Sequence, residues 1–330
     1  MKHRERLTAA LRGEAVDRPP ISLWRHFGGI DMSEDGLVEV MLDFQREYDF
    51  DFLKFMPTGM YSTLDWGVET SWEPHARGTR TVTRHAIAGP ADWESLARLD
   101  VEAGQLGMVN RALDRTVKAT DPDTPVFQTI FSPLTTANKM GGPLTLPHLR
   151  QHQESIRAGL EIIAEVTERM IVAAIERGAG IFFASQMASA DVLTEAEVDE
   201  WETPYIRRLL EPVRGKALVF IHAHGNHLWF DRVREWPADG LNWHDRRGGP
   251  SLAAARARTQ MGLLAGIDGY GKLRTGSRAE LLAEISDAAL QVERGLVVTP
   301  GCVIPMDCPP HLIRAARESI ETFRQAGVGT

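Results

Sequence analysis

The sequence has little cysteine and no excess of basic residues. Only two cysteines, Cys302 and Cys308, occur in 330 residues. That number excludes a framework of several disulfides, and two free thiols are typical of a reducing compartment. The formal net charge of −8 argues against a nucleic-acid partner, because duplex binding depends on clustered lysine and arginine. The remaining expectation is an ordinary globular protein that acts on a small-molecule substrate.

Long apolar runs are also missing from the chain. No uninterrupted apolar stretch approaches the roughly 20 residues that a membrane-spanning helix needs. The first residues, 1–14, are charged and helical in pattern, and they lack the apolar segment of a secretory signal. From these absences we expect a cytoplasmic protein with no membrane partner.

Short β-rich runs alternate with amphipathic helical stretches along the chain, and the alternation indicates the fold class. Helical patterns cover, for example, 36–49, 160–178 and 278–295. Eight such runs alternating with helices predict a closed parallel (β/α)8 TIM barrel, since an open doubly wound sheet usually stops at about five or six strands. The eight runs are 21–26, 51–57, 126–132, 180–189, 218–225, 241–245, 262–268 and 296–305.

The domain organisation follows from composition and from the lengths of the connections. No shift in composition divides the chain, so we expect one domain over 1–330. One long connection, an insertion at about 62–120, interrupts the regular alternation. The alternating pattern at 79–85 predicts a small hairpin followed by a helix. We expect this insertion to fold over one face of the barrel.

Two histidines and one cysteine stand at the ends of predicted strands. His222 and His224 are two residues apart in the run 218–225, so in a strand their side chains point to the same side. Cys302 lies where the run 296–305 should end. Three nitrogen and sulfur ligands with a vacant fourth position are typical of a catalytic zinc site. Taken alone, the His-x-His spacing also fits ordinary surface or core histidines.

Other polar residues occupy the same ends of the predicted strands. Chemistry in such barrels gathers at the carboxyl ends of the strands. Each of these residues taken singly fits a satisfied hydrogen-bonding group, but together they predict one polar rim. They are Arg25, His26, Lys54, Ser132, Ser185, Gln186, His244, Asp245 and Asp268.

Several motifs, in order along the chain, resemble those of the uroporphyrinogen decarboxylase family. They are DRPPISLWRHFGG, DFDFLKFMP, GIFFASQMAS, LVFIHAHGN, GIDGYGKLRTGS and TPGCVIPMDCPPHLIRA. The resemblance covers nearly the whole chain and implies a (β/α)8 barrel. One branch of the family decarboxylates the acetate arms of uroporphyrinogen III without a cofactor. The other branch, the methylcobamide:thiol methyltransferases, uses zinc to activate a thiol that accepts a methyl group from a corrinoid.

The resemblance to the decarboxylase branch is incomplete. That branch carries an Arg-x-x-x-Arg near the first strand, and here the two positions are Arg25 and Gly29. Its pyrrole-binding aspartate corresponds to Asp51, and its late histidine, in a Gly-His-Gly turn, aligns with Cys302. Substrate carboxylates buried without these cations would be poorly neutralised, which argues against the haem-pathway reaction.

The methyltransferase branch has His-x-Cys-Gly after the fifth strand and Gly-Cys after the eighth. This chain has His222-Ala223-His224-Gly225 and Gly301-Cys302. The resemblance therefore implies His222, His224 and Cys302 as zinc ligands, with histidine replacing one cysteine. Imidazole is a normal zinc ligand. The substitution leaves the acceptor open between a thiol, an alkoxide and a zinc-bound water.

The remaining candidates receive roles around this site. Asp268, His244 and Asp245 are the catalytic candidates, with Asp268 either a general base or an acceptor for a histidine N–H; a turn carboxylate is equally compatible. Arg25 is expected to bind a substrate carboxylate or phosphate-like tail, or to form a rim salt bridge. The other expected substrate-binding residues are His26, Asp51, Lys54, Ser185, Gln186 and Trp243. Trp24, Trp66 and Trp229 fit either a pocket wall or the core, and His227 is assigned to a loop outside the ligand set.

The leading hypothesis is a zinc-dependent methyltransferase that activates a thiol or similar acceptor. The chain contains no corrinoid-binding Asp-x-His-x-x-Gly signature, so a corrinoid would arrive free or on a separate corrinoid protein. The alternative is a decarboxylase of a porphyrinogen or another polycarboxylate. A third hypothesis is a corrinoid- or tetrapyrrole-binding module without chemistry. The family resemblance is compatible with a homodimer, although no interface can be read from one sequence.

Overall fold

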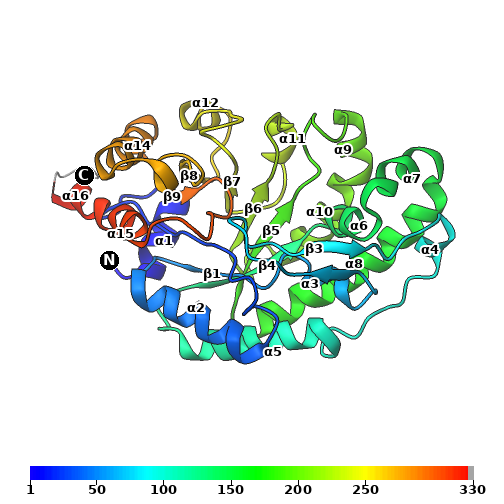
Figure 1. Cartoon of the computed structure of the whole chain (residues 1–330). Helices are drawn as coiled ribbons and strands as arrows, with labels where there is room; N and C mark the ends of the chain where they lie inside the picture. The colour runs from blue at the N-terminus through cyan, green and yellow to red at the C-terminus, as the bar shows by residue number, and fades with distance from the viewer. Residues whose placement is uncertain (326–330) are drawn as a thin grey trace.

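The computed structural model describes residues 1–325, and its centre is a curled parallel sheet of 7 strands in the order β1-β4-β5-β6-β7-β8-β9. Each strand pairs in parallel with the next strand in this order (Figure 1). The strands are β1 Leu53–Phe55, β4 Val126–Phe131, β5 Gly180–Ser185, β6 Val219–Ala223, β7 Gly240–Asn242, β8 Gly262–Ile267 and β9 Leu296–Pro300.

The first predicted strand, 21–26, is not a regular strand in the structure. It meets β9 and the chain beyond it through two isolated parallel bridges, Ile21 to Val298 and Arg25 to Ile304. On its other side the Asp51 amide donates to the Ile21 carbonyl. Pro19 and Pro20 precede the segment, and proline has no N–H to offer a ladder. The extended segment thus occupies the place of the eighth strand and completes the TIM barrel without forming a continuous ladder.

The other predicted strands exist but end earlier than predicted. The run 180–189 leaves the sheet after Ser185, and the run 296–305 leaves it after Pro300. The predicted strands were too long because their apolar pattern continues past the last hydrogen bond between strands. The residues beyond the ladder turn into loops at the barrel mouth, where side chains are free to form a site.

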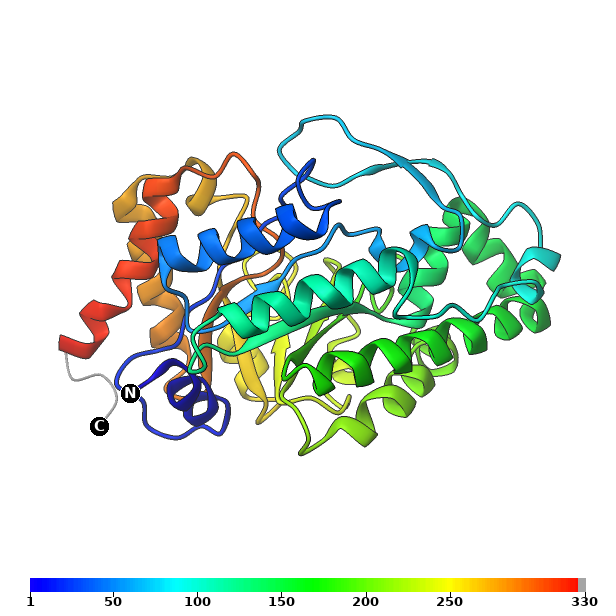
Figure 2. The ribbon, with the colours of Figure 1, turned by 90° about the horizontal axis from the view of Figure 1, so that it is seen from below.

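Helices cover the outside of the sheet, and aromatic rings fill its inside. Figure 2 shows α2, α5 and α8 running side by side along the barrel. Phe127 and Phe220 stack in the interior with ring centroids 4.3 Å apart, and Phe52 packs edge-on against both. Strands β4 and β8 are buried along their whole lengths; β8 is apolar throughout, as is typical of strands covered on both faces, whereas β4 also buries Gln128 and Thr129.

The helices alternate with the strands as the sequence pattern predicted, with short extra helices in the loops. Their bounds are α1 His3–Leu11, α2 Glu34–Tyr48, α3 Tyr61–Leu64, α4 Ala91–Glu94, α5 Gly104–Ala119, α6 Pro133–Gly141, α7 Thr145–Gln151, α8 Gln153–Glu176, α9 Glu195–Trp201, α10 Thr203–Leu210, α11 Phe230–Val233, α12 Leu252–Arg256, α13 Lys272–Thr275, α14 Arg278–Gln291, α15 Pro310–Ser319 and α16 Glu321–Gln325. Within residues 1–325, none of these helices has the length and apolar content to cross a bilayer.

The connection between β1 and β4 contains an antiparallel hairpin, β2 Glu69–Ser71 and β3 Thr81–Arg84, followed by α4 and α5. The loop of this hairpin reaches the segment after β9, where the Met306 amide donates to the Ala76 carbonyl at 2.7 Å. Gly78 packs so closely on His26 and Met306 that a Cβ atom would clash with both. The hairpin therefore lies against the mouth of the barrel.

Candidate metal centre

Three side chains converge at the mouth of the barrel. His222 is on β6 and His224 follows it, so both point to the same side, into the barrel. Cys302 comes just after β9, and its Sγ lies 3.6 Å from His222 Nε2 and 3.8 Å from His224 Nδ1. One ligand atom from each of the three residues lies within 4.8 Å of the others. The predicted convergence of two imidazoles and one sulfur is therefore present in the structure.

The spacing of these donor atoms fits a tetrahedral zinc ion. Zinc–sulfur bonds of about 2.3 Å and zinc–nitrogen bonds of about 2.0–2.1 Å would set sulfur and nitrogen about 3.5 Å apart at a tetrahedral angle. The two sulfur–nitrogen distances here are 3.6 and 3.8 Å. The donor set of two nitrogens and one sulfur also suits zinc chemically.

Asn242 fixes the tautomer of His222. Its amide nitrogen donates to the carbonyls of Leu264 and Pro300, at 2.7 and 2.9 Å. Carbonyls only accept, so the amide oxygen of Asn242 must face His222 Nδ1, which lies 2.6 Å away. Nδ1 therefore carries the proton, and Nε2 presents its lone pair toward Cys302. A histidine held in this way is ready to bind a metal through Nε2.

The backbone after β9 approaches the end of β7 very closely. A Cβ atom at Gly301 would lie 2.8 Å from both the His244 Cα and the Trp243 carbonyl oxygen. Real Cβ atoms do not come that close, so only glycine allows this approach. Gly301 therefore lets the following residue, Cys302, reach the histidines.

The protonation states in this cluster favour a thiolate. Burial alone would raise the pKa of Cys302, but the facing imidazoles of His222, His224 and His244 hold that pKa well below its ordinary value. The hydrogen bond with Cys302 raises the pKa of His224 against the effect of its burial. Burial lowers the pKa of His222, which keeps that ring neutral. A thiolate beside neutral imidazole is the form that binds metal.

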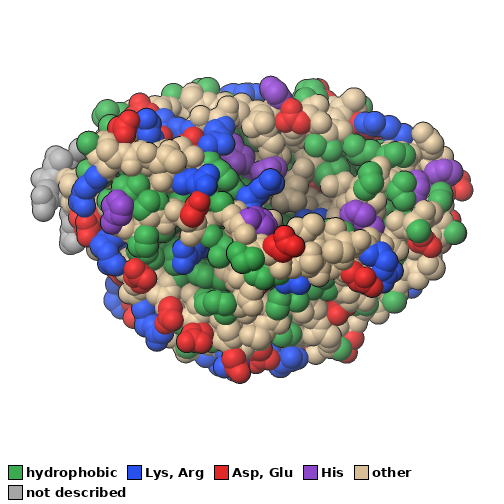
Figure 3. All heavy atoms as spheres, viewed as in Figure 1, with side chains coloured by type: hydrophobic (Ala, Val, Ile, Leu, Met, Phe, Trp, Pro, Cys, Tyr) green, Lys and Arg blue, Asp and Glu red, His purple; other side chains and the backbone are tan. Residues whose placement is uncertain are grey.

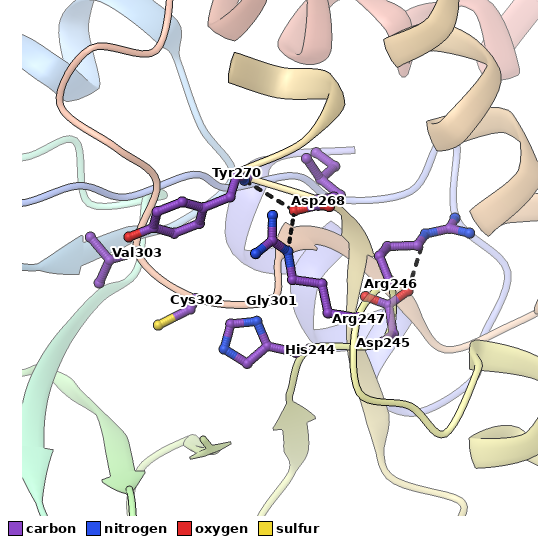
Figure 4. A pocket seen from close by; sticks show the side chains of 11 residues that line it. His244, Asp245, Arg246, Arg247, Asp268, Tyr270, Gly301, Cys302 and Val303 are labelled. Atoms are coloured by element: carbon purple, nitrogen blue, oxygen red, sulfur yellow. Dashed lines mark hydrogen bonds and ion pairs between the residues drawn. The ribbon is translucent and has the colours of Figure 1, made fainter. Parts of the chain in front are cut away.

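His244 lies beside the cluster, and a small pocket opens next to it. Its Nε2 is 3.3 Å from His224 Nδ1. Arg247, Asp268 and Tyr270 line the same pocket as His244 and Cys302 (Figure 4). Figure 3 shows a hollow on one face of the molecule with histidine side chains gathered around it. His244 is thus placed at the site, where the sequence predicted it.

The catalytic roles predicted for Asp268 and Asp245 are not supported by their contacts. Asp268 Oδ1 accepts from Arg247 Nε at 2.8 Å and from the Tyr270 amide at 3.0 Å, and no hydrogen bond joins it to a histidine among residues 1–325. The Asp245 side chain is buried beside Arg246 and accepts from the Gly266 amide. Burial raises the pKa of Asp245 to about 6. Within the cluster, the acceptor that orients His222 is Asn242.

Lys54 and His26, two of the predicted substrate-binding residues, lie inside the barrel mouth. The Lys54 ammonium is over the Phe182 ring at 4.5 Å from its centroid, and the side chain is 5% exposed. His26 is equally buried, and its Nδ1 has no hydrogen-bond partner within the described part of the chain. Both residues therefore remain candidates for contact with a ligand.

Arg25 and Trp243 point away from the mouth, which corrects their predicted role in substrate binding. Side chains alternate along an extended segment, and Trp24 takes the inward position with its ring 5.1 Å from that of Phe182. Arg25 instead stacks on Phe44 and donates to the Met306 carbonyl at 3.2 Å. Trp243 is fully buried and its indole N–H donates to the Pro250 carbonyl, so it belongs to the core.

Asp51 also corrects a prediction, because it precedes β1 and lies at the opposite end of the barrel from the mouth. It is fully buried, with Oδ1 2.6 Å from Arg6 Nη1 and 3.0 Å from His3 Nδ1, and with Oδ2 2.7 Å from Arg18 Nη1. Burial alone would raise its pKa, but hydrogen bonds from His3 and Arg18 hold the pKa well below its usual range. The carboxylate has no capacity left for a substrate and closes the bottom of the barrel.

A buried glutamate, Glu202, explains two predicted serines and was missed in the sequence. Ser132 and Ser185 both donate to Glu202 Oε1, at 2.7 and 2.6 Å. Burial raises the pKa of Glu202 to about 7. Gln186, which follows Ser185, is partly buried, and its backbone N–H donates to Thr135 Oγ1. Ser185 is therefore a partner of Glu202 rather than an available ligand group, and Glu202 carries no sequence signal because it lies between helices.

Other candidates take up structural positions. His227 is exposed and pairs with Asp191 at 2.6 Å, in agreement with its assignment to a loop outside the ligand set. Cys302 and Cys308 are both free thiols. The indole N–H groups of Trp66 and Trp229 donate to backbone carbonyls away from the cluster.

Comparison with known proteins places this chain in a family. A family model described as uroporphyrinogen decarboxylase (URO-D) matches residues 2–323. A methyltransferase from Methanosarcina mazei has a similar structure, with a TM-score of 0.86 and 19% identity over 98% of this chain and 99% of that chain. A B12-independent methionine synthase from Shewanella sp., in complex with selenomethionine, gives a TM-score of 0.62 and 10% identity over 94% of this chain and 97% of that chain.

At these identities the structural similarities establish the fold alone. No curated protein is similar enough in sequence to count as a match. The family match, by contrast, spans nearly all of the chain and agrees with the fold of the M. mazei protein. This chain therefore belongs to the uroporphyrinogen decarboxylase family.

Proposed function

We propose that this protein is a zinc-dependent methyltransferase, in which His222, His224 and Cys302 hold the metal. The observation that carries the proposal is the approach of Cys302 Sγ to His222 Nε2 and His224 Nδ1, at 3.6 and 3.8 Å. Three protein ligands in a mouth open to substrate are typical of a catalytic zinc, because the fourth position is left for the reactant. The zinc would lower the pKa of an acceptor thiol and hold its sulfur ready for methylation.

The residues of the chain prepare this site in distinct ways. Cys302 supplies the negative charge, and Asn242 keeps the lone pair of His222 Nε2 directed at the site. His244 lies beside His224, with its Nε2 3.3 Å from the Nδ1 that faces Cys302. A site built from two imidazoles and one thiolate carries a net charge of about +1 with zinc, so it favours an anionic fourth ligand.

The names of similar structures support methyl transfer as the reaction class. One is called a methyltransferase and another a B12-independent methionine synthase, so these names support the transfer of a methyl group and not the identity of its donor. We propose a corrinoid, free or carried by a separate protein, as the methyl donor and a small thiol as the acceptor. The methyl donor would enter from the open mouth, where the pocket beside Cys302 is lined by Arg247 and Tyr270.

Metal content and methyl transfer test the proposal directly. The purified protein should contain or take up one zinc per chain, and Cys302→Ser and His222→Ala should lose it. With methylcobalamin and a panel of small thiols, the native protein should demethylate methylcobalamin, seen as loss of its absorbance band. Neither variant should do so. His227→Ala is the matched control, since that histidine pairs with Asp191 outside the cluster. A protein that neither contains nor takes up zinc would contradict the proposal.

The family description itself favours a second candidate, decarboxylation of a porphyrinogen or another polycarboxylate. Two groups on which that reading depended point elsewhere, because Arg25 stacks on Phe44 and Asp51 pairs with Arg6 and Arg18. Conversion of uroporphyrinogen III to less carboxylated products, unaffected by Cys302→Ser, would favour this candidate over methyl transfer.

A further inference from the structure

The two histidines of the candidate metal centre are supported in different ways. The side-chain oxygen of Asn242 accepts from the His222 ring at 2.6 Å. By contrast, no side-chain oxygen among residues 1–325 forms a hydrogen bond with the His224 ring, whose Nδ1 faces Cys302 and His244. His224 also lies one residue beyond the end of β6. The position of this ring therefore depends on how its backbone is held.

One peptide group, between Ser185 and Gln186, holds the His224 backbone. The Ser185 carbonyl accepts from the His224 amide at 2.9 Å. The N–H of the same peptide group, that of Gln186, donates to Thr135 Oγ1 at 2.9 Å. A peptide group is a rigid plane, and this one lies where β5 ends. Contacts that fix its two ends therefore also fix the direction of the carbonyl toward His224.

Glu202 is linked to both ends of this peptide group. Its Oε1 accepts from Ser185 Oγ at 2.6 Å and from Ser132 Oγ at 2.7 Å. Ser132 Oγ also lies 2.7 Å from Thr135 Oγ1. Because the single hydroxyl proton of Ser132 is donated to the carboxyl oxygen, Thr135 is the donor in that contact. The hydrogen bonds thus form a closed ring that begins at the Gln186 amide and returns to Ser185 through Glu202.

The burial of Glu202 is not explained by its own contribution to stability. The side chain is fully buried, and Oε2 has no hydrogen-bond partner among residues 1–325. Within the same residues no cation pairs with it, in contrast to the buried Asp51, which contacts Arg6 and Arg18. A buried carboxyl group with one unpaired oxygen destabilises a fold. What Glu202 provides is the hydrogen-bonded ring at the end of β5.

We propose that Glu202 is a positioning residue of the candidate metal centre, which fixes the Ser185–Gln186 peptide group and through it the backbone of His224. The inference rests on the proposed function, because it takes His224 as a metal ligand. A ligand that is already held in place loses less conformational freedom when the ion binds, so the affinity is higher. Glu202 itself forms hydrogen bonds with the two serines and not with the ligands, so it acts only through this peptide group.

Zinc affinity, measured by competition with a chelator, and the visible absorption bands of the cobalt(II)-substituted protein test this link. Glu202→Leu and Ser185→Ala each break the link, so both should weaken zinc binding about tenfold and shift the cobalt(II) bands, which report on ligand geometry. Glu202→Gln keeps an oxygen that accepts from both serines, so it should restore the native affinity and bands. Ser22→Ala is the matched control, because this equally buried hydroxyl donates to the Phe52 carbonyl, and it should change neither.

Hydrogen exchange of the His224 amide gives a readout that needs no metal. In the zinc-free chain, NMR should show faster exchange of this amide in Glu202→Leu and Ser185→Ala than in the native protein. Exchange in Glu202→Gln should match the native rate, because the ring of hydrogen bonds stays closed.

Native zinc affinity and cobalt(II) bands in Ser185→Ala, or unchanged exchange of the His224 amide in that variant, would overturn the role of Glu202 and leave the proposed function standing. This variant decides the question if Glu202→Leu does not fold. A Glu202→Gln protein that loses as much affinity as Glu202→Leu, or an equal loss in Ser22→Ala, also overturns the role. A native chain that takes up neither zinc nor cobalt contradicts the proposed function and, with it, this inference.

Discussion

The two ends of the barrel treat buried charge in opposite ways. At the N-terminal end, Asp51 is fully buried and contacts Arg6, Arg18 and His3. At the mouth, Lys54 is buried just as deeply against aromatic rings, and no carboxylate within the described chain pairs with it. Asp51 lies just before the short strand β1, and Lys54 lies within it. The two ends of β1 therefore differ in whether a buried charge has a partner of opposite charge among residues 1–325.

This difference reflects what each end contributes. Charges that are paired inside the protein hold segments together, and Asp51 joins α1, the segment 17–21 and the start of β1. Charges left unpaired destabilise the fold, and they persist where function requires them. The mouth accordingly contains the cysteine–histidine cluster as well as Lys54, which has no carboxylate partner among residues 1–325.

The largest effect is expected from removal of the shared carboxylate at the N-terminal end. Asp51→Ala leaves Arg6 and Arg18 buried without it, so we expect a loss of about 3–5 kcal/mol in the free energy of unfolding. Urea denaturation followed by circular dichroism measures this. Asp114→Ala, which removes an exposed pair with Lys118, should cost less than about 1 kcal/mol. Equal losses in the two variants would show that the buried position of Asp51 adds nothing to the stability that its ion pairs provide.

Replacement of the unpaired lysine should have the opposite sign. Lys54→Met removes a buried cation and keeps the apolar stem among Trp24 and Phe182, so we expect a gain on the order of 1–4 kcal/mol in the free energy of unfolding. Differential scanning calorimetry should show a higher melting temperature. Lys118→Met, at the surface, is the control. A destabilised Lys54→Met protein would mean that the ammonium has a stabilising partner.

A smaller effect is expected when the support of the candidate metal centre is removed. Asn242→Leu deletes the oxygen that accepts from His222 Nδ1, and loss of such a partner typically weakens metal affinity about 10- to 100-fold. Competition with a zinc chelator measures this. Asn110→Leu removes another buried asparagine, which lies in α5 and donates to the Val101 carbonyl, and should leave zinc affinity unchanged.

The pH dependence of stability should separate the native protein from Lys54→Met. Burial lowers the pKa of Lys54 from 10.5 to about 7, so the unfolded chain binds an extra proton between these values. The penalty for this lysine is fully present below pH 7 and is relieved as the pH rises toward 10.5. The advantage of Lys54→Met should therefore shrink by up to about 1.4 kcal/mol per pH unit in this range. A constant difference from pH 6.5 to 9 would contradict the assignment.

The sequence predicted the convergence of side chains that depends on local spacing and missed what depends on distant contacts. His222, His224 and Cys302 were identifiable because strand periodicity orients the histidines together and parallel strands end at one rim. Asn242 carried no such signal, since an asparagine in a strand is usually unremarkable. Arg25 was placed at the mouth because of its position, but the alternation that turns Trp24 inward turns Arg25 outward.

The sequence by itself determined the alternation of strands and helices, the barrel class and the candidate ligand triad, because these follow from periodicity and from the order of motifs. Tertiary structure alone decided which charges are paired. Asp51 pairs with Arg6 and Arg18 at one end, while Lys54 lies over the Phe182 ring at the other end and pairs with no carboxylate of residues 1–325. Pairing depends on distances between residues far apart in the chain, and only packing of the complete barrel sets those distances.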